Sequence, residues 1–129
     1  MKSLQDYTFK ENGRYNIALL WKENFTGFPE TFNMAYKRLQ AVERKMHRDP
    51  EYAELYRAKM NDYVAKGYAK VISDDENVSS RMSFFLPHFA VRNPNKPGIR
   101  LVFDAAAKCE GMSLNDALMA GPDLNQTLI

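Results

Sequence analysis

Three cations surround a turn-forming stretch in the last third of the sequence, and they are the residues best suited to bind phosphate. Arg92 precedes the stretch NPNKPG, Lys96 lies within it, and Arg100 follows it. A guanidinium presents planar N–H donors that match phosphate oxygens in a bidentate way, and it keeps its charge at every relevant pH. If the flanking apolar runs pair as a hairpin, all three cations lie at or near its tip. One hypothesis is therefore a small module with weak, salt-sensitive affinity for nucleic acid.

Other groups that could do chemistry are few. Cys109 and His88 could form a nucleophile and base pair, but an unpaired thiol and a packed strand-end histidine are the favoured interpretation. The acidic triplet 74–76 could bind a metal ion or could be a solvated loop. The solvated loop is the favoured interpretation, because no further oxygen ligands are spaced around the triplet. A single cysteine and two distant histidines do not suit a zinc site. We therefore predict no metal site and no cofactor on these residues.

The sequence lacks the common short motifs of catalytic and nucleotide-binding sites. It contains no Asp-Thr/Ser-Gly, Gly-x-Ser-x-Gly, His-Glu-x-x-His, Gly-x-x-x-x-Gly-Lys or Gly-x-Gly-x-x-Gly. The pattern leaves no catalytic residue to assign, and whether the chain is part of an enzyme stays open at this point.

Composition indicates one folded domain without revealing its function. The 129 residues suffice for a small core, and 18 Lys and Arg against 16 Asp and Glu give only a slight basic surplus. No apolar stretch has the length of a signal peptide or of a bilayer span. We therefore expect an intracellular protein, in the cytoplasm, with no membrane partner.

The first half of the chain predicts a short strand and then a pair of helices. Residues 14–22 alternate apolar and polar side chains after the turn pair Asn12-Gly13. Pro29 suits a first helical turn, so a helix should begin within a residue or two of it. Apolar residues then recur at helical spacing on one face: Phe32, Ala35, Tyr36, Leu39, Val42 and Met46.

A second helix should follow after a tight link. Asp49 is the expected N-cap, Pro50 the first helical residue, and Gly67 the left-handed C-terminal stop. A link this short predicts antiparallel neighbours. Residues 68–73 are expected to form a short strand, followed by the acidic loop.

The last third predicts a β-hairpin and a short helix. The runs FAVR and IRLVFD should pair across the turn NPNKPG. Ser113 and Asp116 form a variant of the capping box, and Gly121-Pro122 should end the short helix. The expected fold class is α+β, as an incomplete domain.

A series of motifs gives this chain a family resemblance. Leu86-Pro87-His88, Arg100-Leu-Val-Phe-Asp104, Ser113-Leu-Asn-Asp116 and Gly121-Pro122, in that order, resemble the beginning of the reverse transcriptase of Bel/Pao-type LTR retrotransposons. The upstream half, with Gly13-Arg14-Tyr15, Leu19-Leu20-Trp21-Lys22, Asp49-Pro50, Tyr56 and Gly67-Tyr68, is similar to the connector that follows the aspartic protease in those elements. The resemblance covers residues 13 to about 128.

The resemblance implies roles for individual residues. The hairpin would belong to the polymerase fingers, with Arg100 directed at nucleotide phosphates and Lys96 as a weaker second contact. Asp104 would hold the end of the strand, and Asn115 would fix the following loop. The implied organisation is an N-terminal connector with a short strand (1–27), a helix pair with a short strand (28–72), an acidic loop (73–80) and partial fingers (81–129).

The resemblance also implies what these residues lack. A polymerase holds two Mg²⁺ ions with carboxylates of its palm, on one strand and on a Tyr-x-Asp-Asp hairpin, and the sequence has no such motif. The expected function is thus that of a polyprotein fragment whose parent performs RNA-directed DNA synthesis, inactive alone. Its partners would be an RNA or DNA template-primer and the remainder of the polyprotein. The alternatives are the nucleic-acid-binding module and a non-functional genomic remnant.

Overall fold

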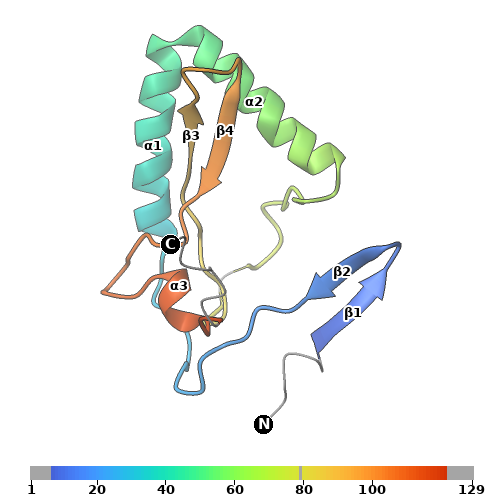
Figure 1. Ribbon diagram of the computed structural model, residues 1–129. Coiled ribbons are helices and arrows are strands. Elements are labelled where there is room, and N and C mark those ends of the chain that lie inside the picture. The colour runs from blue at the N-terminus through green and yellow to red at the C-terminus, as the bar shows by residue number, and fades with distance from the viewer. Residues whose placement is uncertain (1–6, 79, 122–129) are drawn as a thin grey trace, which may run out of the picture.

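The α+β fold consists of two separate antiparallel hairpins and three helices in the part of the chain that is described (Figure 1). This computed structural model describes residues 7–78 and 80–121. In chain order the elements are β1 (Thr8–Glu11), β2 (Arg14–Ile17), α1 (Phe32–Arg48), α2 (Pro50–Ala65), β3 (His88–Arg92), β4 (Ile99–Phe103) and α3 (Leu114–Ala117). The predicted fold class is confirmed.

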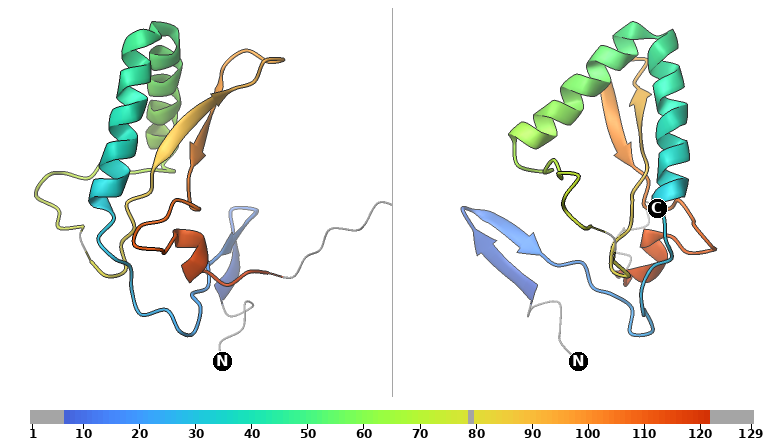
Figure 2. Two further views of the ribbon diagram at one scale, coloured as in Figure 1. Left: turned by 90° about the vertical axis from the view of Figure 1, so that its left-hand side faces the viewer. Right: turned by 180° about the vertical axis from the view of Figure 1, so that it is seen from behind.

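The first hairpin, β1–β2, forms around the turn that the sequence indicates. Asn12 and Gly13 both have positive φ, at 49° and 77°, which is the requirement of a type I′ turn. The strands pair from Glu11 with Arg14 to Thr8 with Ile17. Every side chain of β2 is exposed, and the hairpin lies away from α1 and α2 in all three views (Figures 1 and 2).

Helix α1 begins at Phe32, later than Pro29 indicated. Thr31 is the N-cap residue, yet its hydroxyl oxygen accepts a hydrogen bond from the backbone N–H of Phe85 at 2.8 Å instead of capping its own helix. The Glu30 carboxylate accepts from the free N–H of Phe32 at 2.8 Å. Thr31 is almost fully buried, so this tertiary contact rather than the proline fixes where the helix starts.

Helix α2 has both of its expected ends. The Asp49 carboxylate accepts from the N–H of Tyr52 at 3.0 Å, and Pro50 occupies the first helical position. At the other end Gly67 has φ +74°, its N–H donates to Val64, and the N–H of Tyr68 donates to Tyr63. These two bonds form a Schellman motif, as the sequence predicts for Gly67.

The core lies where the second hairpin packs against the helix pair. The chain reverses direction between α1 and α2, the helices diverge from their common link, and β3–β4 lies against both of them (Figures 1 and 2). The buried cluster contains residues from all four elements: Val42, Tyr52, Tyr56, Ala90, Ile99 and Leu101. The two helices contact each other as well as the same hairpin, so one core joins all four elements.

The prediction of a strand at residues 68–73 is wrong. The N–H groups of Tyr68 and Ala69 donate back to the carbonyl of Tyr63 and close the end of α2, so they are not available to a strand partner. Val71 is 73% exposed, and in the described part of the chain the strands belong only to the two hairpins. The apolar content of this run belongs to an extended surface segment.

Helix α3 has the predicted start but an earlier end. The Ser113 hydroxyl accepts from the N–H of Asp116 at 3.1 Å and the Asp116 carboxylate accepts from the N–H of Ser113 at 3.0 Å, which completes the capping box. The helix ends at Ala117, not at Gly121, because the backbone becomes extended at Leu118 and residues 117–119 pair with an earlier segment. Pro122 lies outside the described residues.

That earlier segment is residues 20–22. The N–H of Lys22 donates to Ala117 at 2.9 Å and the N–H of Met119 donates to Leu20 at 2.8 Å, with Trp21 bridged to Leu118. Trp21 also contacts the rings of Phe25 and Phe28.

Within residues 7–78 and 80–121, no helix combines the length and apolar character needed to cross a bilayer.

Candidate nucleic-acid interface

The tip of the β3–β4 hairpin is the site that the sequence singles out. Its connecting residues, 93–98, are closed by the Asn93 side chain, which accepts from the N–H of Asn95 at 2.9 Å, and by Gly98 at φ +93°. The strands pair from Arg92 with Ile99 to His88 with Phe103, as the sequence predicts. Asparagine and glycine thus fix a turn that carries Lys96 at the end of a packed hairpin.

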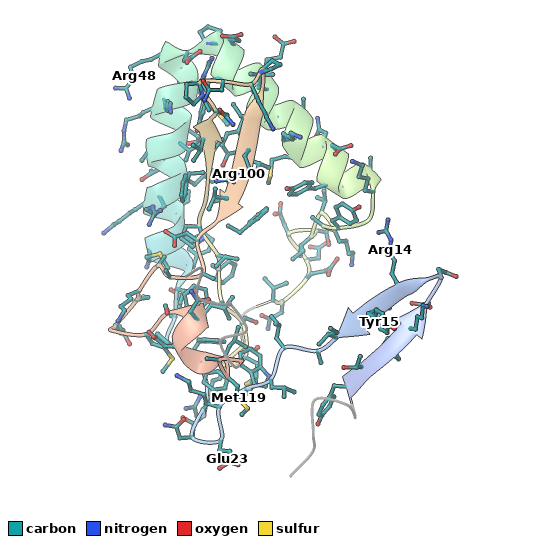
Figure 3. All side chains as sticks on the ribbon, in the orientation of Figure 1. Arg14, Tyr15, Glu23, Arg48, Arg100 and Met119 are labelled. Carbon is teal, nitrogen blue, oxygen red and sulfur yellow. The ribbon has the colours of Figure 1, made fainter. Side chains whose placement is uncertain are left out.

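Strand alternation places Arg92 and Arg100 on opposite faces of this hairpin. Arg92 pairs with Ile99, which is 7% exposed and faces the helices. Arg100 is the next residue on β4 and pairs with exposed Val91 on the outer face (Figure 3). The hairpin therefore does not gather the two arginines into one cluster, although both contribute to one protrusion.

Arg92 is held by acidic residues of the helix link. Its guanidinium donates to the carboxylates of Asp49 at 3.0 Å and Glu51 at 3.1 Å. The hydrogen bond that Arg92 donates to Glu51, together with the charge of Asp49, raises the pKa of Arg92. Because two carboxylates already offset its charge, Arg92 is less suited to phosphate than the sequence indicates.

Arg100 and Lys96 are both exposed and available. Neither side chain forms an ion pair with any residue in the described ranges. Arg100 lines a hollow of about 270 Å³ at the tip. Its lining consists of Val91, Arg92, Asn93, Pro94 and Arg100. The tip therefore offers two free cations, and one of them, Arg100, lines a small concave surface.

Asp104 and Asn115 both make hydrogen bonds that hold neighbouring segments of the fold together. The Asp104 carboxylate accepts from Arg38 of α1 at 2.9 Å and from the N–H of Ala106 at 3.2 Å. Its own N–H donates to Pro87 at 2.8 Å, which extends the hairpin pairing by one bond. The N–H of Asn115 donates to Ala105 at 3.0 Å, so the start of α3 is attached to the segment that follows β4.

The structure keeps Cys109 and His88 in different surroundings. The Tyr56 hydroxyl and His88 Nδ1 share a hydrogen bond, and burial lowers the pKa of His88. The Cys109 thiol donates to the carbonyl of Glu30 at 3.3 Å. Each group therefore has its own partner, in agreement with the interpretation of a packed histidine and an isolated thiol.

The acidic loop also has a local explanation. Glu76 forms an ion pair with Lys70 at 3.2 Å. Within the described ranges, no three His, Cys, Asp or Glu residues are grouped closely enough to hold a metal ion. The carboxylates that are described in this chain thus do not have the arrangement that the two Mg²⁺ ions of a polymerase require.

Sequence reasoning missed the partners of Arg92. The available signal was the alternation of β3, in which buried Ala90 and Arg92 occupy the same face. An arginine on the core-facing side of a hairpin needs a counterion from whatever packs there. The acidic pair that flanks Pro50 at the helix link supplies it.

Comparisons with protein-family models, with curated proteins and with solved structures gave no match to this chain.

Proposed function

We propose that these residues are a piece of a Bel/Pao-type retrotransposon polyprotein, covering the connector after the protease and the N-terminal fingers of the reverse transcriptase. In this proposal the β3–β4 hairpin contacts template or nucleotide phosphates through Arg100, with Lys96 as a second contact. The observation that supports this phosphate contact is that both cations are exposed at the hairpin tip and have no carboxylate partner in the described part of the chain.

The two arginines of the hairpin have different roles in this proposal. Arg92 is anchored to Asp49 and Glu51, and so it fixes the tip relative to the helix link. Arg100, on the outer face, is free to present its guanidinium fork to phosphate oxygens. A rigid support for a free cation lowers the entropic cost of binding, because less of the hairpin must become ordered.

Catalysis is not proposed for these residues alone. Phosphoryl transfer by a polymerase depends on Mg²⁺ ions held by palm carboxylates, and the residues described here do not fit that site. The proposed contribution of the chain is to position nucleic acid for the parent enzyme. RNA-directed DNA synthesis would belong to that enzyme as a whole.

The binding proposal is tested by titrating labelled RNA–DNA hybrid and single-stranded RNA with the 129-residue protein at two salt concentrations. Arg100→Ala and Lys96→Ala should each weaken binding and lower the slope of log K against log salt by about 0.9 on a duplex. Arg14→Ala, which removes an exposed cation from β2, is the matched control. Equal affinities for Arg100→Ala and Arg14→Ala would contradict the proposal and favour a non-functional remnant.

The proposed origin has a separate test. The genomic reading frame that encodes this chain is sequenced downstream, where an aspartate-bearing strand and a Tyr-x-Asp-Asp hairpin are expected. A frame that continues without either motif would remove the polymerase assignment. Primer extension by the 129 residues should give no product, and Mg-dependent extension would show that the catalytic part of the proposal is wrong.

A further inference from the structure

Helix α1 is much more basic than the chain as a whole. It carries five Lys and Arg residues and one Glu, whereas the net charge of the entire sequence is only +2. An amphipathic helix places its polar residues on the face opposite its buried ones. Val42 is the buried residue of α1, and at about 100° per residue Lys37, Arg44 and Arg48 lie on the opposite side of the helix axis from it.

Three of these cations form a straight row. Lys37, Arg44 and Arg48 are separated by seven and four residues, which at about 100° per residue puts them within about 40° of one another around the helix axis. At about 1.5 Å rise per residue the row is about 16 Å long. Figure 3 shows Arg48 at the end of α1, directed away from the β3–β4 hairpin.

The row is available for binding. Arg38 is paired with Asp104, and the ammonium group of Lys45 lies 4.2 Å from the centre of the Tyr52 ring. In contrast, Lys37, Arg44 and Arg48 are exposed and form no ion pair with a described residue. Arg48 lies in the last turn of α1, where the helix dipole favours a positive charge. The dipole does not explain the positions of Lys37 and Arg44, which lie further from the C-terminal end.

We infer that the row Lys37, Arg44 and Arg48 on α1 binds the phosphate backbone of double-stranded nucleic acid. A duplex carries about one charge per 1.7 Å of its axis, so a rigid row about 16 Å long meets several phosphates without bending either partner. This contact reads no bases, because the row contains only long cationic side chains that reach the backbone.

Two other anionic partners, a membrane and single-stranded nucleic acid, suit this row of cations less well than a duplex. An amphipathic helix that lies in a membrane interface inserts its apolar face, but the apolar face of α1 includes Val42 of the buried core. Single-stranded nucleic acid is held by aromatic side chains on which bases stack. The polar face of α1 offers none of them, since the aromatic residues Phe32 and Tyr36 lie at positions turned away from the row.

This surface differs from the hairpin tip in element and in residues, so the inference does not depend on the proposed function. Arg100 and Lys96 can fail to bind while the α1 row binds, and the reverse also holds. The two sites are therefore separated by variants that change one set of cations at a time.

The test compares two triple variants of the full chain with the same change in net charge. The first is Lys37→Gln, Arg44→Gln, Arg48→Gln, in which glutamine preserves helix propensity. The control is Arg14→Gln, Arg57→Gln, Lys59→Gln, exposed cations on β2 and α2. Binding to labelled duplex DNA is measured by fluorescence anisotropy over a range of salt concentrations. The first variant should lose at least about tenfold in affinity, and its salt slope should fall by about 2.7, because three phosphate contacts are gone.

Charge-preserving substitution provides the second measurement. Lys37→Arg, Arg44→Lys, Arg48→Lys should bind duplex DNA nearly as well as the parent protein, and far-UV circular dichroism shows whether each variant keeps its helices. Equal losses in the two glutamine variants would overturn the inference, as would a folded charge-preserving variant that no longer binds. Stronger row-dependent binding to phosphatidylserine vesicles than to duplex DNA would overturn it in favour of a membrane surface.

Discussion

The two hairpins of this protein have similar size and pairing but very different surroundings. β1–β2 has four residues per strand and an Asn-Gly turn well suited to its geometry, yet its side chains are almost all exposed. β3–β4 has five residues per strand, a longer turn, and three residues in the buried core. Local turn chemistry thus suffices to set the register of a hairpin, while burial against helices must supply its stability.

The contacts of β3–β4 show what that stabilisation consists of. The rings of Tyr52 and Tyr56 are almost completely buried beneath the hairpin, at 1% and 2% exposure. Their hydroxyl groups reach the carbonyl of Ala90 and the ring of His88. Burial raises the pKa of Tyr56, so its hydroxyl stays protonated. In contrast, no residue of strands β1 and β2 is buried.

The largest expected difference between the hairpins comes from matched isoleucines. Ile99 on β4 is 7% exposed and Ile17 on β2 is 58% exposed. Ile99→Ala should lower the free energy of unfolding by about 2–5 kcal/mol, because it removes core contacts and leaves a cavity. Ile17→Ala should change it by about 0.5 kcal/mol or less. Urea unfolding followed by circular dichroism measures both, and equal losses would show that β1–β2 also contributes to the core.

A smaller effect is expected where the tip of β3–β4 meets the helix link. Asp49→Ala removes the N-cap of α2 and a partner of Arg92, and should cost about 1 kcal/mol of unfolding free energy. Asp49→Ser keeps a capping oxygen but loses the carboxylate, so it should recover most of the loss. Thermal unfolding compares the two variants. If serine gives no recovery, the ion pair with Arg92 rather than the cap is the stabilising contact.

The smallest effect concerns pH. Burial lowers the pKa of His88 below its ordinary value of 6.5 in the folded protein. As the pH falls through about 6.5 the unfolded chain therefore takes up a proton that the folded protein does not, and stability decreases until the folded pKa is reached. Unfolding free energies at pH 7 and pH 5 should thus differ less in His88→Gln than in the parent protein. The same slope in both proteins would mean that other groups, not the packed face of β3, set the pH dependence.

Most elements could be predicted because their signals are local. Asn12-Gly13, Asp49-Pro50, Gly67 and the Ser113 capping box each determine the geometry of a few neighbouring residues. Two of the failures depend on distant partners: Thr31 at the start of α1 accepts from Phe85, and residues 117–119 pair with residues 20–22. The strand predicted at residues 68–73 fails for a local reason, because the N–H groups of residues 68–69 bond back to Tyr63.

The candidate site was predictable only in part, for the same reason. The turn and the three cations of the hairpin follow from sequence, but the capture of Arg92 by Asp49 and Glu51 joins segments that are far apart in the chain. The row on α1 could be read from spacing alone. Its availability could not, because that depends on which cations of the helix find partners, as Arg38 does with Asp104.

The pairing of residues 20–22 with residues 117–119 has a consequence for folding kinetics. It joins segments about a hundred residues apart through the two backbone hydrogen bonds that form the bridge of Trp21 with Leu118, so it closes a long loop for few contacts. The helix pair and β3–β4 can assemble from closer segments before that loop closes. This junction should therefore form last during folding and open first under native conditions, with amide exchange at Lys22 and Met119 faster than at the core strands.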